Sequence, residues 1–235
     1  LLPTTRPIEA APTTNVLRGG ITINEVLIDP NGSTNFDTDR DGRADALDEF
    51  VEVYNASDST IDIGVLELWD YGQGQWFTFP AGTTLGASNY AVVVCGVQSG
   101  GSLPAVTGGN LAFDVGRGLA VINNGGDNAV LYDPDTDEYV QLRYNGDAAD
   151  DPPTDYESFS TTATRVGIVE DWGSDSDGVS LVRIPGPDVD HCDGSSWWKM
   201  DTVTRVSLRE VWGSSGRDVF AVGYYQDGAY VPTYT

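Results

Sequence analysis

The sequence predicts an all-β fold, a β-sandwich with extended segments at its N- and C-terminal ends. Short apolar runs recur along most of the chain and are separated by Gly, Asn, Asp and Pro, which is the pattern of strands joined by turns. No stretch sustains a helical period beyond about two turns. With 235 residues, 40% of them hydrophobic, the chain is long and apolar enough to bury a core.

Each expected strand follows from its local pattern. Alternating residues predict strands with one buried face, whereas the unbroken apolar run at 90–97 predicts a strand buried on both faces. Asn-Gly-Gly-Asp at 124–127 and the Asp/Pro-rich segment 133–137 predict hairpin turns. The polar segment 145–177 predicts a long excursion over the surface. The expected strands are 21–28, 50–55, 61–69, 76–79, 90–97, 119–123, 129–132, 139–144 and 179–184.

These elements divide the chain into three parts. Residues 1–20 are rich in Thr and Pro and predict an extended segment, residues 21–205 hold the sandwich, and residues 206–235 predict a C-terminal hairpin or strand segment. The apolar residues at 219–222 have strand composition but no evident partner in the sequence. We therefore expect self-association in which 8–17 or 219–231 is donated as a strand to a neighbouring copy.

Several motifs resemble those of lamin-tail domains. They are INEV at 23–26, DEFVEVYN at 48–55, FPAGT at 79–83 and GVSLVR at 178–183, and the resemblance extends over about residues 21–200. It implies an immunoglobulin-like sandwich without catalytic residues, in a family whose prokaryotic members are usually extracellular or attached to the cell surface. A separate segment, LREVWGSSGRDVFAVG at 208–223, resembles one unit of a propeller-type repeat, which cannot bury its own faces alone.

The loop at 37–48 carries the sharpest chemical signal. Acidic side chains occupy positions 1, 3, 5, 9 and 12 of a twelve-residue loop, with Gly42 at position 6 for a sharp turn. Calcium prefers six to eight such oxygen ligands. Arg43 would add its backbone carbonyl, and Glu49 is an alternative to the last carboxylate, in a pattern that resembles dockerin loops. The predicted carboxylate ligands are Asp37, Asp39, Asp41, Asp45 and Asp48.

The charge balance and the missing motifs exclude several functions. A net charge of −24 repels phosphate backbones, so nucleic acid is not an expected partner, and no apolar run is long enough for membrane insertion. His191 is the only histidine, which rules out a site with three imidazoles, and the sequence contains no nucleophile elbow or phosphate-binding loop. We therefore expect no enzymatic activity, with a hydrolase that uses two carboxylates as the alternative, because acidic residues are plentiful.

The two cysteines and two sequons suggest covalent features of a secreted protein. Cys95 and Cys192 favour one disulfide, with two separate thiols as the alternative. Asn31 and Asn55 begin possible N-glycosylation sequons, although Asn55 also suits a structural role at a strand end.

Together these features predict a non-catalytic, calcium-binding structural or adhesive module. We expect it outside the cell or on its surface, with itself or other surface proteins as partners, and the subunit of a filament is one form that such a module could take. The alternative is an accessory or carbohydrate-binding domain of a larger secreted enzyme, because six tryptophans are available to stack on glycans.

Overall fold

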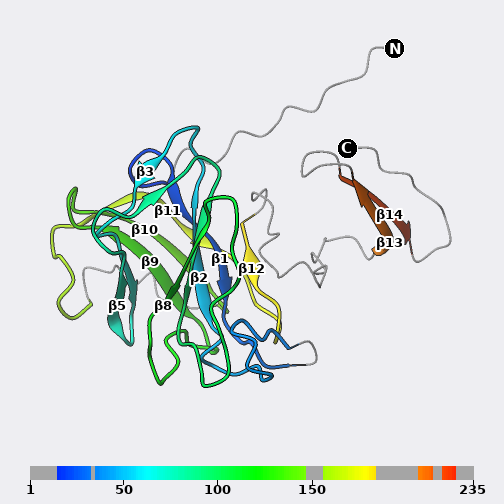
Figure 1. Cartoon of the computed structure of the whole chain (residues 1–235). Helices are drawn as coiled ribbons and strands as arrows, with labels where there is room; N and C mark the ends of the chain where they lie inside the picture. The colour runs from blue at the N-terminus through cyan, green and yellow to red at the C-terminus, as the bar shows by residue number, and fades with distance from the viewer. Residues whose placement is uncertain (1–14, 33–34, 147–155, 184–205, 214–218, 226–235) are drawn as a thin grey trace, which may run out of the picture. The chain divides into compact units, whose positions relative to one another are not determined.

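The computed structural model describes residues 15–32, 35–146 and 156–183, together with two strands at 206–213 and 219–225 (Figure 1). These residues form strands, turns and loops, and none of them lies in a helix. Consequently, no described segment is a helix that could cross a membrane. The chain divides into two compact units, Leu1–Gly194 and Ser195–Thr235.

The first unit is a sandwich of two five-stranded sheets. Its first sheet has the order β12 (Leu181–Val182), β1 (Ile21–Leu27), β2 (Phe50–Asn55), β7 (Tyr90–Val94) and β8 (Leu111–Asp114). The second has the order β11 (Thr164–Asp171), β10 (Glu138–Tyr144), β9 (Asp127–Asp133), β4 (Glu67–Asp70) and β5 (Gly74–Thr78). A short pair, β3 (Ile61–Asp62) and β6 (Thr84–Leu85), lies beside them. This architecture confirms the predicted all-β sandwich.

The main core lies between the two sheets and follows from strand alternation. Val51 and Val53 of β2 point into it, as do Ala91 and Val93 of β7. In β1 the register shifts between Ile23 and Glu25, a bulge that changes which residues face inward. The residues of β1 and its flanks that reach the core are Leu17, Ile21, Ile23, Val26 and Ile28.

A second apolar cluster covers part of the outer face of the first sheet. Leu27, Phe50 and Val94 are direct cross-strand neighbours on β1, β2 and β7. Val92 completes the buried set, and this group is called the outer cluster below. Because Ala91 and Val93 face the main core while Val92 and Val94 face outward, the prediction that this strand is buried on both faces is confirmed.

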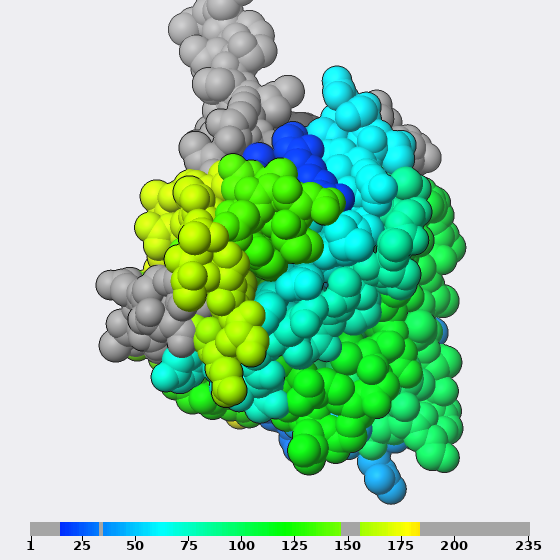
Figure 2. Space-filling model, turned by 90° about the vertical axis from the view of Figure 1, so that its left-hand side faces the viewer, coloured from blue at the N-terminus to red at the C-terminus, as the bar shows by residue number. Residues whose placement is uncertain are grey.

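The second sheet also carries side chains on its outer face, and these are aromatic. Phe159 packs on Trp69 of β4 and on Tyr132 of β9, with ring centroids 4.9 and 4.7 Å apart. Residues 156–171 (yellow-green) lie beside the β9–β10 hairpin (green) in Figure 2. The segment 156–163 therefore packs over this sheet before the chain enters β11.

Two expected strands differ in the structure. The predicted strand 61–69 is split into β3 and β4, because the chain turns at Gly64 and Val65. Val65 has a φ of 63°, which is incompatible with a continuous strand. The predicted strand 119–123 is a loop, so the predicted hairpin across 124–127 is wrong. Strand β9 pairs instead with β10 and β4, and the amides of Val121 and Ile122 donate to the Glu49 carboxylate.

The excursion predicted for 145–177 contains a strand that sequence reasoning missed. Strand β11 pairs in parallel with β10, and Asn15 both donates to the Ile168 carbonyl and accepts from its amide, at 2.9 and 3.0 Å. The sandwich also begins before residue 21, because Leu17 lies in the main core.

The second unit contains one described hairpin. Strand β13 (Val206–Gly213) pairs antiparallel with β14 (Val219–Tyr225). The expectation that 219–222 lacks a partner is therefore wrong: these residues pair with β13, from Val219 opposite Gly213 to Val222 opposite Glu210. The other predicted donor segment, 8–17, lies largely outside the described residues.

Candidate metal centre

The acidic loop lies between β1 and β2, on the side of the first sheet that carries the outer cluster. Alternation along the chain explains this position, because Asp48 precedes the outward Phe50 by two residues. Gly42 has a φ of 95°, the left-handed conformation expected of the glycine at the turn. The loop therefore folds back on itself where the sequence predicts.

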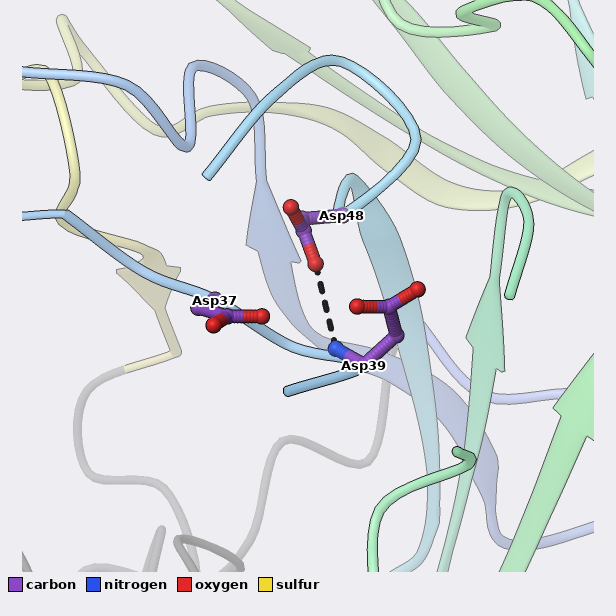
Figure 3. A group of neighbouring side chains, drawn as sticks. All are labelled: Asp37, Asp39 and Asp48. Carbon is purple, nitrogen blue, oxygen red and sulfur yellow. Dashed lines mark hydrogen bonds between the residues drawn. The ribbon is translucent and has the colours of Figure 1, made fainter. Parts of the chain in front are cut away.

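Three of the five predicted carboxylates converge. Asp37, Asp39 and Asp48 each offer a carboxylate oxygen, and these oxygens lie within 4.8 Å of one another (Figure 3). Asp39 and Asp48 are completely buried, whereas Asp37 is half-buried. Asp37 Oδ2 accepts from the Gly42 amide, while its buried Oδ1 has no hydrogen-bond partner among the described residues.

Backbone amides hold Asp48 in place. Its Oδ1 accepts from the amides of Thr38 and Asp39 at 2.7 and 3.1 Å, and its Oδ2 accepts from the amide of Asp45 at 2.9 Å. Burial and, to a lesser extent, the neighbouring Asp39 carboxylate raise the pKa of Asp48 to about 6, although these amides act to lower it. A positive charge between the carboxylates would relieve this penalty.

The two remaining predicted carboxylates lie outside this group. Asp41 Oδ1 accepts from the Arg43 amide at 2.8 Å. Asp45 Oδ1 accepts from the Leu47 amide and from Gln98 Nε2, at 3.0 and 2.9 Å. These side chains therefore stabilise the loop itself in the structure.

Glu49 points away from the loop. Its Oε2 accepts from the amides of Val121 and Ile122 at 3.0 and 2.9 Å, and Cys95 Sγ lies 3.6 Å from it. Burial raises the pKa of Glu49 to about 7. Because adjacent residues entering a strand point to opposite sides, Asp48 faces the metal group and Glu49 faces the main core. Glu49 thus anchors the 119–123 loop, and is not placed to substitute for Asp48.

The geometry of the group suits a hard cation. Three carboxylates, one of them with an unpartnered buried oxygen, supply the charge and ligand type that calcium prefers. Calcium needs six to eight oxygens in total, so backbone carbonyls such as that of Arg43, and water, would have to complete the set.

The cysteine and asparagine predictions fare differently. Cys95 is buried and is a free thiol among the described residues, while Cys192 lies outside them, so the disulfide stays a prediction. Asn31 is exposed in the loop after β1, and its glycosylation also stays a prediction. Asn55 is completely buried, and its Nδ2 donates to the carbonyls of Ser59, Leu85 and Gly86. Asn55 therefore has the structural role, with its amide inaccessible in the folded chain.

Two of the tryptophans are core residues and are not available to stack on glycans. Trp69 and Trp76 are 6% and 7% exposed, and Trp172 lies under the Arg183 guanidinium, 5.5 Å from its ring centroid. Trp197 and Trp198 lie outside the described residues. Trp69 and Trp76 therefore give the carbohydrate-binding alternative no support, and that alternative stays a prediction.

A buried acid pair lies elsewhere, at one end of the main core. Asp70 and Asp127 are 4% and 7% exposed and bond to each other through their side chains. Burial, followed by the charge of Asp127, raises the pKa of Asp70 to about 7. Burial, followed by the charges of Asp127 and Asp70, also raises the pKa of Tyr144.

We predict that this pair makes stability depend on pH. The folded chain holds the Asp70 proton more tightly than the unfolded chain, so the stabilisation is complete below the unfolded pKa near 4 and is lost as pH rises through about 7. The slope for one such group is at most about 1.4 kcal/mol per pH unit. In Asp70→Asn an amide replaces the protonated carboxyl group. The free energy of unfolding by urea, measured in EGTA from pH 5 to 8, should therefore depend less on pH in this variant than in the wild type. An unchanged slope, matching that of the exposed control Asp58→Asn, would contradict this assignment.

The sheets and their shared core define an immunoglobulin-like β-sandwich, the class of protein to which the first unit belongs. The sequence profile of the lamin tail domain family matches residues 17–146, more than half of the chain, and the chain belongs to this family. No curated protein and no solved structure gave a significant match. Family membership supports a non-catalytic sandwich module.

Proposed function

We propose that this chain is a calcium-stabilised structural module that acts outside the cell or on its surface. The observation that carries the proposal is the convergence of Asp37, Asp39 and Asp48 within 4.8 Å. Buried like charges at this distance destabilise the loop unless a cation neutralises them. The ion would therefore contribute to folding rather than to chemistry, as befits a module without catalytic residues.

Thermal unfolding with and without calcium tests this function. At calcium one hundred times the dissociation constant, binding should stabilise the fold by about 2.7 kcal/mol, or about 5–10 °C in melting temperature. Asp37→Asn should lose most of this shift, whereas the exposed control Asp58→Asn should retain it. Equal melting temperatures in calcium and in EGTA would refute the proposal.

We further propose that the module associates with other copies of itself, from its acidic charge and its terminal segments. A net charge of −24 keeps copies apart unless cations screen it, so divalent ions should favour association. Strand donation by 219–231 is less favoured now that β14 pairs with β13, and Asn15 and Leu17 are already engaged within their own sandwich, so the part of 8–17 that precedes Asn15 is the donor we propose. Deleting residues 1–14 should then abolish any calcium-promoted oligomer in light scattering. An oligomer that survives the deletion would exclude this segment.

A further inference from the structure

Within the described chain, side chains from two loops cover the outer cluster, beside Tyr90 of β7. Phe36, from the loop between β1 and β2, packs edge-on against Phe50 with ring centroids 5.6 Å apart. Leu103, from the loop between β7 and β8, packs on the same cluster. Leu27, Phe50, Val92 and Val94 are at most 1% exposed beneath them. The outer face of the first sheet therefore has a small core of its own, closed by loops instead of a further sheet.

Asp39 joins the two loops. Its Oδ2 accepts from the Gln98 amide at 2.6 Å, and its backbone carbonyl accepts from the Ser102 amide at 2.6 Å. Gly101 lies so close that a Cβ there would be 2.4 Å from Asp39 Oδ2. Gln98 Nε2 adds a second link, to Asp45 Oδ1. These contacts, together with the main-chain bond to Leu47 from Gly96, fix one loop against the other.

Asp39 is also one of the three carboxylates of the candidate metal centre. It follows Phe36 by three residues, and Ser102, which bonds to it, precedes Leu103. Asp39 is thus linked, through short stretches of chain, to both Phe36 and Leu103. Without a cation, repulsion from Asp37 and Asp48 acts on Asp39; with a cation, the same groups attract a common centre.

We propose that cation occupancy at Asp37, Asp39 and Asp48 closes the two loops over the outer cluster, and that loss of the cation opens them. This inference rests on the proposed calcium binding and adds a consequence to it. The bound ion holds the loop segments 36–39 and 98–103 closed over the outer cluster, an arrangement called the latch below. Opening exposes the apolar face made by Leu27, Phe50, Val92 and Val94, while the main core stays intact because its residues lie on the opposite face of the sheet.

Amide exchange measured by NMR on the full chain tests the latch. The readouts are the amides of Gln98 and Ser102, which donate to Asp39, and the reference is the amide of Cys95, which donates to the Glu49 carbonyl. If opening releases the ion, calcium at one hundred times its dissociation constant should slow exchange at Gln98 and Ser102 about a hundredfold relative to EGTA. Exchange at Cys95 should change much less, and Asp37→Asn should remove the calcium effect.

Two further measurements separate this inference from the proposed function. Leu103→Ala keeps all three carboxylates, so it should bind calcium in a titration yet bind more of the apolar dye ANS than the wild type in calcium. Calcium binding with unchanged exchange at Gln98 and Ser102 would overturn the latch and leave the proposed function standing. No calcium binding by the folded wild type would overturn both.

Discussion

Replacing Arg183 by Met should destabilise the sandwich by about 2–4 kcal/mol, because it removes the more deeply buried partner of a largely buried ion pair. Arg183 is 8% exposed and pairs with Glu170 of β11 through both of its terminal nitrogens. It also donates to the Ile23 carbonyl from Nε at 3.0 Å and to Thr22 Oγ1 at 2.9 Å. This one side chain joins β1 of the first sheet to β11 of the second.

Urea unfolding of matched variants measures this effect. Arg165 lies on the same strand as Glu170 but is exposed, so Arg165→Met should change stability by no more than about 0.5 kcal/mol. Arg183→Lys should recover only part of the loss, because an ammonium cannot reproduce the bidentate pair or the stacking on Trp172. Equal stabilities for Arg183→Met and Arg165→Met would show that the Arg183–Glu170 pair does not stabilise the contact between the sheets.

Replacing Glu49 by Ala should cost about 2–5 kcal/mol, because it leaves two buried amides without an acceptor. The amides of Val121 and Ile122 both donate to Glu49 Oε2, and they belong to a loop with no strand partner there. Glu49→Gln keeps an oxygen acceptor and resembles the protonated acid, so it should change stability by less than about 1 kcal/mol at neutral pH.

The difference between these two variants is the informative quantity. Guanidinium unfolding of Glu49→Ala and Glu49→Gln at pH 7, both in EGTA, isolates the hydrogen-bond role from any effect on calcium. If Glu49→Gln lowers the free energy of unfolding as much as Glu49→Ala does, the carboxylate does more than accept hydrogen bonds from this loop. If Ala is harmless, Glu49 does not anchor the loop.

The sequence predicted the parts of the fold that depend on local pattern. Alternation and turn residues located β2 and the β9–β10 hairpin, and the lamin-tail motifs indicated the sandwich around them. The apolar run around Val92 predicted burial on both faces, which the two clusters confirm. These features are encoded within a few residues of one another, so a single sequence is sufficient to show them.

The features that the sequence could not show depend on distant contacts. Strand β11 has mostly exposed or half-buried residues and forms by pairing with β10, so its own composition gave no signal. The apolar segment 119–123 is fixed by hydrogen bonds to the side chain of Glu49, about seventy residues earlier, and not by pairing with a neighbouring strand. Spacing predicted five carboxylate ligands, whereas Asp45 is engaged by Gln98, a partner from another loop.

The most direct test of this account is a calcium titration of the folded wild-type chain by isothermal calorimetry. We expect binding of one ion in the loop, lost in Asp39→Asn and Asp48→Asn and retained in Asp58→Asn. Asp41→Asn distinguishes the ligands predicted from sequence spacing from those that converge in the structure. Asp41 is a ligand in the spacing pattern but does not belong to the converged group of three carboxylates. If Asp41→Asn weakens calcium binding much less than Asp39→Asn does, the result would support the three-carboxylate centre. Absence of calcium binding by the wild type, or binding that survives Asp39→Asn and Asp48→Asn, would contradict it.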